Sequence, residues 1–166
     1  FSYQGTVYGM PSTGNAQGVV YNKRIYKEAG ITEVPKTPDE FLAALETIKK
    51  NTKAIPLYSN FAAGWTMGAW DAYIGGSATG DADYMNKMPH LKDPFSDNGD
   101  GTGPYAVYNI LYEATARKLI ESDPTTTDWE GCKGMINRGE IATLVLGSWA
   151  VVQMQDAGDR PEDIGY

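Results

Sequence analysis

Apolar positions recur at helical spacing in six stretches of the chain. In the strongest of them, residues 37–40 form a capping box, in which the Thr37 hydroxyl caps the helix and Glu40 reaches back. Apolar residues then follow on one stripe as far as Ile48. A second capping box, residues 127–130, opens another predicted helix. The six predicted helices cover residues 22–30, 37–50, 65–74, 104–120, 127–138 and 149–158.

Short apolar runs between these stretches predict strands. Residues 141–146 are almost continuously apolar, which is typical of a strand covered on both faces. Other short runs, rich in β-branched and aromatic residues or placed at the chain end, lie at residues 6–8, 18–21, 55–58 and 163–166. Residues 77–103 are dominated by Gly, Ser, Thr, Asn, Asp and Pro and predict an irregular surface excursion. Strands interleaved with helices indicate an α/β fold, with a small mixed sheet flanked by helices.

The length of the chain indicates the number of domains, and its charge and apolar runs indicate which partners to exclude. The 166 residues correspond to a single domain at about 150 residues per domain. With 14 basic and 21 acidic residues the net charge is −7, and the basic residues are scattered. Because phosphate backbones are bound by clustered Lys and Arg, we expect no nucleic-acid partner. The sequence contains no run of 18 apolar residues, so no transmembrane segment is predicted.

The residue types that carry catalysis or metal binding are sparse. Cys132 sits at helical spacing among apolar residues and is predicted to be buried, whereas His90 lies in a polar stretch, so no thiol–imidazole pair is expected. One His and one Cys leave no transition-metal cluster. Residues 96–101 resemble a calcium loop, but its twelfth position is Val107 where a Glu is required. Residues 99–103 are glycine-rich without following a strand. We therefore expect no catalytic residue, no metal and no cofactor.

Aromatic residues are the informative part of the composition, with 4 Trp and 11 Tyr. Ligands of α/β folds sit beyond the carboxyl ends of strands, and Trp65 and Trp149 fall where strands hand over to helices. An indole in such a loop presents a flat apolar face, on which the C–H face of a sugar ring can stack. Trp70 and Trp129 lie inside predicted helices, where core packing is the simpler interpretation. Polar side chains suited to sugar hydroxyls occupy the same loops: Asn15, Gln17, Asn60 and Asp71.

Three segments in order resemble the family 1 extracellular solute-binding proteins, the maltose-binding-protein-like receptors of carbohydrate ABC importers. They are residues 9–23 with their Tyr-Asn-Lys ending, residues 29–41 with the Pro-x-Thr-x-x-Glu-Phe pattern, and residues 137–149 ending in Gly-Ser-Trp. The resemblance implies that Trp149 and Trp65 are aromatic ligand contacts. It implies that Asn15 is a polar contact, and Asp71 joins the candidate ligand-binding set by location alone.

The resemblance also implies the context of the chain. The fold would be a periplasmic-binding-protein type II lobe, namely the second of two lobes, so that residues 1–166 form one lobe of a longer receptor that begins before Phe1. Such a receptor is extracytoplasmic, either periplasmic or a cell-surface lipoprotein, and it binds sugar non-covalently between its lobes without performing chemistry. Its partners would be a sugar or oligosaccharide and the ABC permease. The alternative is a fragment of a carbohydrate-active enzyme or a lectin-like module.

Overall fold

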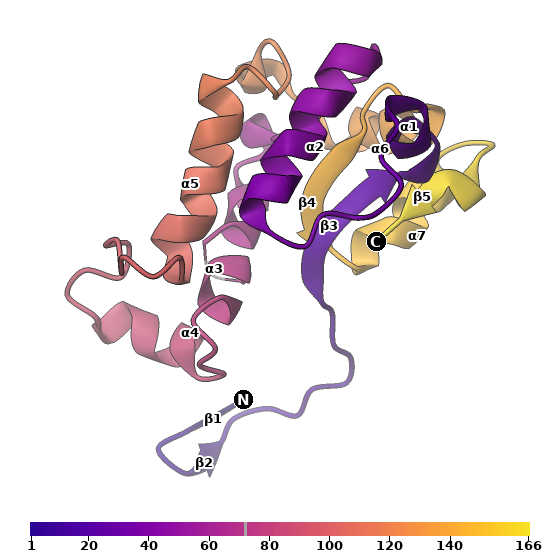
Figure 1. The fold of residues 1–166 in the computed structure, drawn as a ribbon. Helices are drawn as coiled ribbons and strands as arrows, with labels where there is room; N and C mark the ends of the chain where they lie inside the picture. Colours follow the sequence, from indigo (N-terminus) through magenta and orange to yellow (C-terminus); the bar gives the residue numbers. More distant parts are fainter. Residues whose placement is uncertain (72) are drawn as a thin grey trace.

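The computed structural model describes residues 1–71 and 73–166 and contains a small mixed sheet at its centre (Figure 1). Three antiparallel strands lie in the order β4-β3-β5, with β3 at Gln17–Asn22, β4 at Thr143–Gly147 and β5 at Ile164–Gly165. Residues 55–58, predicted as a strand, make parallel bridges that link Ile55 to Ile141 and Tyr58 to Leu144. The sheet is therefore mixed, as expected.

Helices cover the sheet on both sides. The α-helices are α1 (Lys23–Ala29), α2 (Pro38–Asn51), α3 (Ile74–Ser77), α4 (Tyr84–Lys87), α5 (Gly103–Ala116), α6 (Trp129–Arg138) and α7 (Trp149–Asp156). The short 3-10 helices are η1 (Phe61–Ala63), η2 (Trp65–Ala69), η3 (Met88–His90), η4 (Pro124–Thr126) and η5 (Pro161–Asp163). The predicted irregular stretch 77–103 thus carries α4 and η3 between its turns.

Strand β4 is buried along its whole length because it has a core on each face. Leu144 and Leu146 pack into a cluster with residues of α6 and α7. Val145, which points the other way, packs with residues of α2 and α5. The alternation follows from the period of two in a strand. It confirms the prediction of a strand covered on both faces.

The predicted helix over residues 65–74 is wrong. The chain forms η2 first and then the separate helix α3, and Gly75 and Gly76 lie inside α3 instead of ending a helix. Gly64, at φ +52, directly precedes this stretch and Gly68 lies within it, and glycine is a poor helix former. Gly75 is required for packing, because a Cβ there would lie 2.7 Å from the Cα of Pro104 at the start of α5.

The two predicted capping boxes have different outcomes. Thr37 caps α2 as expected, since its hydroxyl accepts from the Glu40 N–H at 3.2 Å. In α6 the N-cap is Asp128 and not Thr127: the Asp128 carboxylate accepts from the N–H groups of Glu130 and Gly131. An aspartate one residue later gives the same cap, and its negative charge is attracted to the positive end of the helix dipole.

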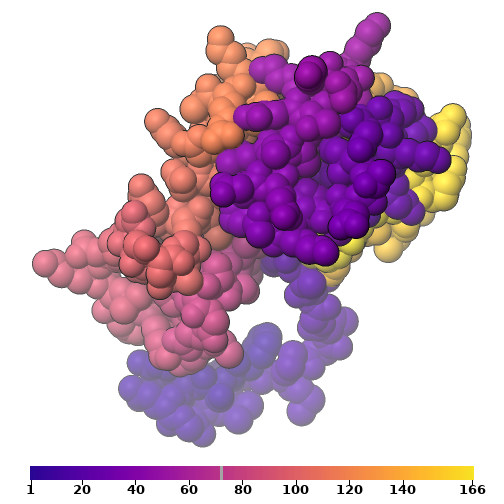
Figure 2. Space-filling model, viewed as in Figure 1, coloured from indigo at the N-terminus to yellow at the C-terminus, as the bar shows by residue number. Residues whose placement is uncertain are grey.

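The N-terminal segment extends away from the rest of the molecule (Figures 1 and 2). Its strands β1 (Ser2–Tyr3) and β2 (Thr6–Val7) form a separate hairpin. The predicted strand at residues 6–8 therefore exists but does not join the main sheet. Within the described residues, no helix combines the length and apolar character needed to cross a membrane.

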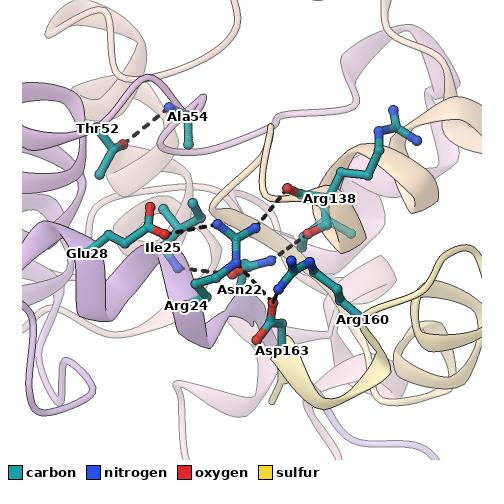
Figure 3. Close-up of polar contacts among 10 residues, drawn as sticks. Asn22, Arg24, Ile25, Glu28, Thr52, Ala54, Arg138, Arg160 and Asp163 are labelled. Carbon is teal, nitrogen blue, oxygen red and sulfur yellow. Dashed lines mark hydrogen bonds and ion pairs between the residues drawn. The ribbon is translucent and has the colours of Figure 1, made fainter.

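Asn22 joins strand β3 to two helices. Its side chain is fully buried, and Oδ1 accepts from the Ile25 N–H at 3.0 Å to cap α1. Its Nδ2 donates to the carbonyl of Ile136 in α6 at 2.8 Å. Beside it, Arg24 donates to Asp163 at 3.1 Å and to the Arg138 carbonyl at 2.9 Å (Figure 3). The side chains of Asn22 and Arg24 therefore link β3, α1, α6 and η5 by hydrogen bonds.

Substituting Asn22→Ala tests this junction. The change leaves the buried Ile25 N–H without its acceptor and removes one of two donors to the Ile136 carbonyl, which keeps the Gly139 N–H at 3.1 Å. We therefore expect the free energy of unfolding to fall by about 2–3 kcal/mol. Thr37→Ala, which removes one exposed cap, is the matched control and should cost about 1 kcal/mol. Urea denaturation followed by circular dichroism measures both, and equal losses would contradict the assigned role of Asn22.

Candidate functional site

Three tryptophans from distant parts of the chain form one cluster. Trp65 begins η2, Trp129 begins α6 and Trp149 begins α7. The ring centroids of Trp65 lie 5.2 Å from Trp129 and 5.7 Å from Trp149, and those of Trp129 and Trp149 are 5.6 Å apart. Trp65 is 53% exposed, while the other two are half-buried. Such tilted and edge-on contacts are the favoured geometries of aromatic pairs.

The position of Trp149 follows from the turn after β4. Gly147 ends the strand, and its lack of a side chain is required because a Cβ there would collide with the Trp149 indole. The next residue, Ser148, donates its N–H to the Ala16 carbonyl at 2.8 Å, and its hydroxyl accepts from the Ala16 N–H at 3.2 Å. This reciprocal pair fixes the segment before β3 beside the start of α7.

Trp129 supports the other two rings from the protein side. It packs against the core cluster of α6, α7 and β4. The Lys133 ammonium lies 4.7 Å from its ring centroid, within cation–π range, and donates to Glu130 at 2.8 Å. Trp129 is therefore held on one side by packing and on another by charge, so the cluster is largely preformed.

A pocket of about 290 Å³, here called the tryptophan pocket, opens beside Trp65 and Trp149. Its lining includes Gln17, Trp65, Thr66, Tyr73, Leu146 and Trp149. Apolar indole faces stand next to the amide of Gln17 and the phenol of Tyr73. A flat ring that carries hydroxyls suits this combination, because apolar walls with a few polar groups give both affinity and orientation.

The structure brings together some of the predicted site residues and not others. Trp65 and Trp149 line the tryptophan pocket, and Asn15 lines an adjoining pocket of about 540 Å³ that shares Gln17 and Tyr73. Asp71 is absent from the described linings of both pockets. The assignment of all four as ligand contacts stays a prediction.

Asp71 has a partner inside the protein instead. The Tyr108 hydroxyl donates to its carboxylate at 3.1 Å. Burial, together with the negative charge of Asp71, raises the pKa of Tyr108 to about 12. Tyr108 therefore stays protonated at neutral pH and continues to donate to Asp71.

The prediction of core packing is complete for Trp70 and incomplete for Trp129. Trp70 is buried in the core, as expected. Trp129 was expected in the core and does pack there, but it also completes the tryptophan cluster. Gln17 was named from sequence among the polar side chains suited to sugar hydroxyls but was left out of the four predicted contacts, and Tyr73 was not named. In the structure Gln17 lies at the start of β3, directly opposite Gly147.

Cys132 is buried, which confirms the sequence prediction, and His90 is exposed. Burial raises the pKa of the Cys132 thiol to about 12, so the thiolate needed for nucleophilic attack is scarce at neutral pH. Among the described residues, no group of three His, Cys, Asp or Glu side chains is arranged to hold a metal ion.

The sequence profile of one family, described as bacterial extracellular solute-binding protein, matches residues 1–166. The chain belongs to this family. The predicted resemblance is therefore confirmed, and so is the predicted α/β fold of a periplasmic-binding-protein type II lobe, because solved solute-binding proteins superpose on the chain.

Two solved structures from Bifidobacterium animalis subsp. lactis are 56% identical to this solute-binding protein over 99% of its chain, each with a TM-score of 0.89. One is a binding protein of an ABC transporter in complex with mannobiose, and the other is a manno-oligosaccharide-specific solute-binding protein in complex with mannotriose. A curated relative, the multiple sugar-binding protein of Streptococcus mutans, is 38% identical over 90 residues, or 54% of this chain. This chain spans 39% of each Bifidobacterium chain, and the match covers 21% of the Streptococcus protein.

The burial of the Cys132 thiol can be tested by its rate of alkylation. At pH 8 we expect iodoacetamide to label Cys132 about a hundredfold more slowly than an exposed thiol, because so little thiolate forms. A Cys132→Ser, His90→Cys double variant supplies the exposed thiol for comparison. In denaturant the two proteins should label at similar rates. Comparable rates in the native proteins would contradict the burial of Cys132.

Proposed function

We propose that this chain is one lobe of the two-lobe receptor of a carbohydrate ABC importer and that its ligand is a manno-oligosaccharide. The observation that carries the proposal is the tryptophan pocket, in which Trp65 and Trp149 present indole faces beside polar side chains. Neighbours that are 56% identical were solved with mannobiose and mannotriose, which supports a manno-oligosaccharide in particular.

Binding in this proposal is non-covalent. A pyranose ring stacks its C–H face on the indoles, and the amide of Gln17 and the hydroxyl of Tyr73 bond its hydroxyl groups. No residue performs chemistry on the sugar, in keeping with a family of binding proteins. Apolar contact gives most of the affinity, and the polar groups give orientation.

In this proposal the other lobe of the receptor completes the cleft. This chain spans 39% of the length of the mannobiose-bound neighbour, so that protein has enough additional chain for another lobe. Closure of two lobes around a ligand is a hinge motion, and the closed form is what the membrane permease recognises. In this proposal the complete receptor is extracytoplasmic, whether periplasmic or lipid-anchored.

Trp149→Ala in the complete receptor tests the pocket. Loss of one stacking face should weaken manno-oligosaccharide binding more than tenfold, which corresponds to at least about 1.4 kcal/mol. Isothermal titration calorimetry measures the affinity, and a thermal melt establishes that the variant is folded. Tyr112→Ala, which removes an exposed aromatic of α5 outside the pocket, is the control and should leave affinity unchanged. Equal affinity of Trp149→Ala and wild type would remove Trp149 from the site.

The half-cleft gives a second prediction. The 166-residue chain alone offers only one side of the site and cannot close, so we expect its affinity for mannotriose to be at least a hundredfold below that of the complete receptor. Calorimetry on the two proteins side by side makes the comparison. Micromolar binding by the isolated chain would show that this lobe carries the site by itself.

A further inference from the structure

The loop over residues 97–102, just before α5, contains an asparagine in an unusual setting (Figure 1). Of the eight asparagines of the chain, Asn98 alone is followed by a glycine, and both Asn98 and Gly99 are exposed. The backbone nitrogen after an asparagine can attack the carbon of the side-chain amide when no Cβ hinders its approach. The sequence of this loop therefore places a reactive pair of residues in contact with solvent.

The surroundings of Gly99 leave room for this attack. Its φ is +73, in the left-handed region that glycine adopts without strain, and a Cβ built on it would meet no atom within 4 Å. Its N–H donates to the Asp97 carboxylate at 2.8 Å. That carboxylate therefore already accepts the hydrogen that the Gly99 nitrogen has to lose in the reaction.

The Asn98 side chain is held by long hydrogen bonds. Its Nδ2 donates to the Thr102 carbonyl at 3.4 Å and to the Thr102 hydroxyl at 3.3 Å. Both distances exceed the range of about 2.7–3.2 Å that is usual for an N–H···O bond. The side chain can therefore leave Thr102 and turn its amide carbon toward the Gly99 nitrogen at small cost.

The next pair, Asp100 and Gly101, has the same spacing, but its hydrogen bonds oppose the corresponding loss of water. The Asp100 carboxylate accepts from the Thr102 hydroxyl at 2.6 Å and from the Thr102 N–H at 2.9 Å. These bonds hold the pKa of Asp100 below its usual range. An ionised carboxylate is a poor target for a nucleophile, because attack on it would have to expel an oxide ion. Asn98 is therefore the more reactive of the two positions.

We propose that Asn98 and Gly99 form a site of spontaneous deamidation, which replaces the Asn98 amide by a carboxylate. The Gly99 nitrogen bonds to Cγ of Asn98, the bond between Cγ and Nδ2 breaks, and ammonia leaves with the proton from Gly99. Water then opens the five-membered imide at either carbonyl and gives aspartate or isoaspartate. The reaction needs no co-reactant other than water.

Deamidation in this proposal loosens the loop from α5. A Cβ at Gly103 would lie 2.9 Å from Nδ2 of Asn98, so the amide lies against the start of the helix. A carboxylate cannot donate, so both bonds to Thr102 are lost. The new negative charge also joins those of Asp97 and Asp100 in the same loop, and like charges repel. Because this loop forms part of the wall of a groove of about 710 Å³ beside α5, the modification alters that surface.

Peptide mass spectrometry of the folded protein during storage at pH 8 tests the proposal. We expect Asn98 to convert to aspartate and isoaspartate at least about tenfold faster than Asn109, which is also exposed but precedes Ile110, whose side chain hinders the attack. Similar rates at the two positions would overturn the proposal. Asn98→Gln keeps the amide but would have to form a larger ring, so it should stay unmodified. Conversion of that variant at the wild-type rate would also overturn the proposal.

Asn98→Asp reproduces one product and tests the loosening of the loop. Chymotrypsin can cleave after Phe95, which is 47% exposed in the same loop region, and we expect this cleavage to be at least about threefold faster in Asn98→Asp than in wild type, because cleavage follows local opening. Asn109→Asp, which adds the same charge on α5, is the matched control and should cleave at the wild-type rate. Thermal melts establish that both variants are folded. Equal cleavage of folded Asn98→Asp and wild type would refute the loosening.

Discussion

The antiparallel ladder between β3 and β4 is the constraint on which the rest of this lobe depends. Its register pairs Gln17 with Gly147 and Tyr21 with Thr143. Because the strands run in opposite directions, the start of β3 lies beside the end of β4. The segment containing Asn15 therefore meets the turn that carries Trp149, although more than 130 residues separate them in sequence. A slip of one residue would turn every side chain of β4 to the opposite face.

The same ladder explains why the site is rigid. Strand β4 is fixed by a core on each face, so the turn after Gly147 has little freedom. Ser148 and Ala16 then bond to each other at the end of the ladder. On the other side of the cluster, Trp129 is held by the core and by Lys133. The aromatic faces are thus ordered before any ligand arrives, which lowers the entropy cost of binding.

Prediction from sequence succeeded where local and long-range signals agree. Strand β4 and helix α2 carry unbroken apolar patterns, and their caps or turns use the residues that these elements require. It failed at residues 65–74, where apolar spacing favoured a helix but Gly64, Gly68 and the close approach of Pro104 decided otherwise. The Asp128 cap was missed because Thr127 fits the same local pattern. Only the folded chain distinguishes the two.

The candidate site also contains residues that the sequence could identify and residues that only the fold reveals. Trp65 and Trp149 could be selected from sequence because each follows a strand end. Gln17 was named from sequence for its loop position alone, and Tyr73 could not be named, since its place beside Gln17 in the tryptophan pocket comes only from the fold. Asp71 illustrates the converse, because its loop position suggested a ligand contact while Tyr108 already donates to it. A polar residue near a pocket becomes a good candidate when its hydrogen-bonding groups are still available. By this criterion the exposed Asn15 is a stronger candidate for meeting a sugar hydroxyl than Asp71.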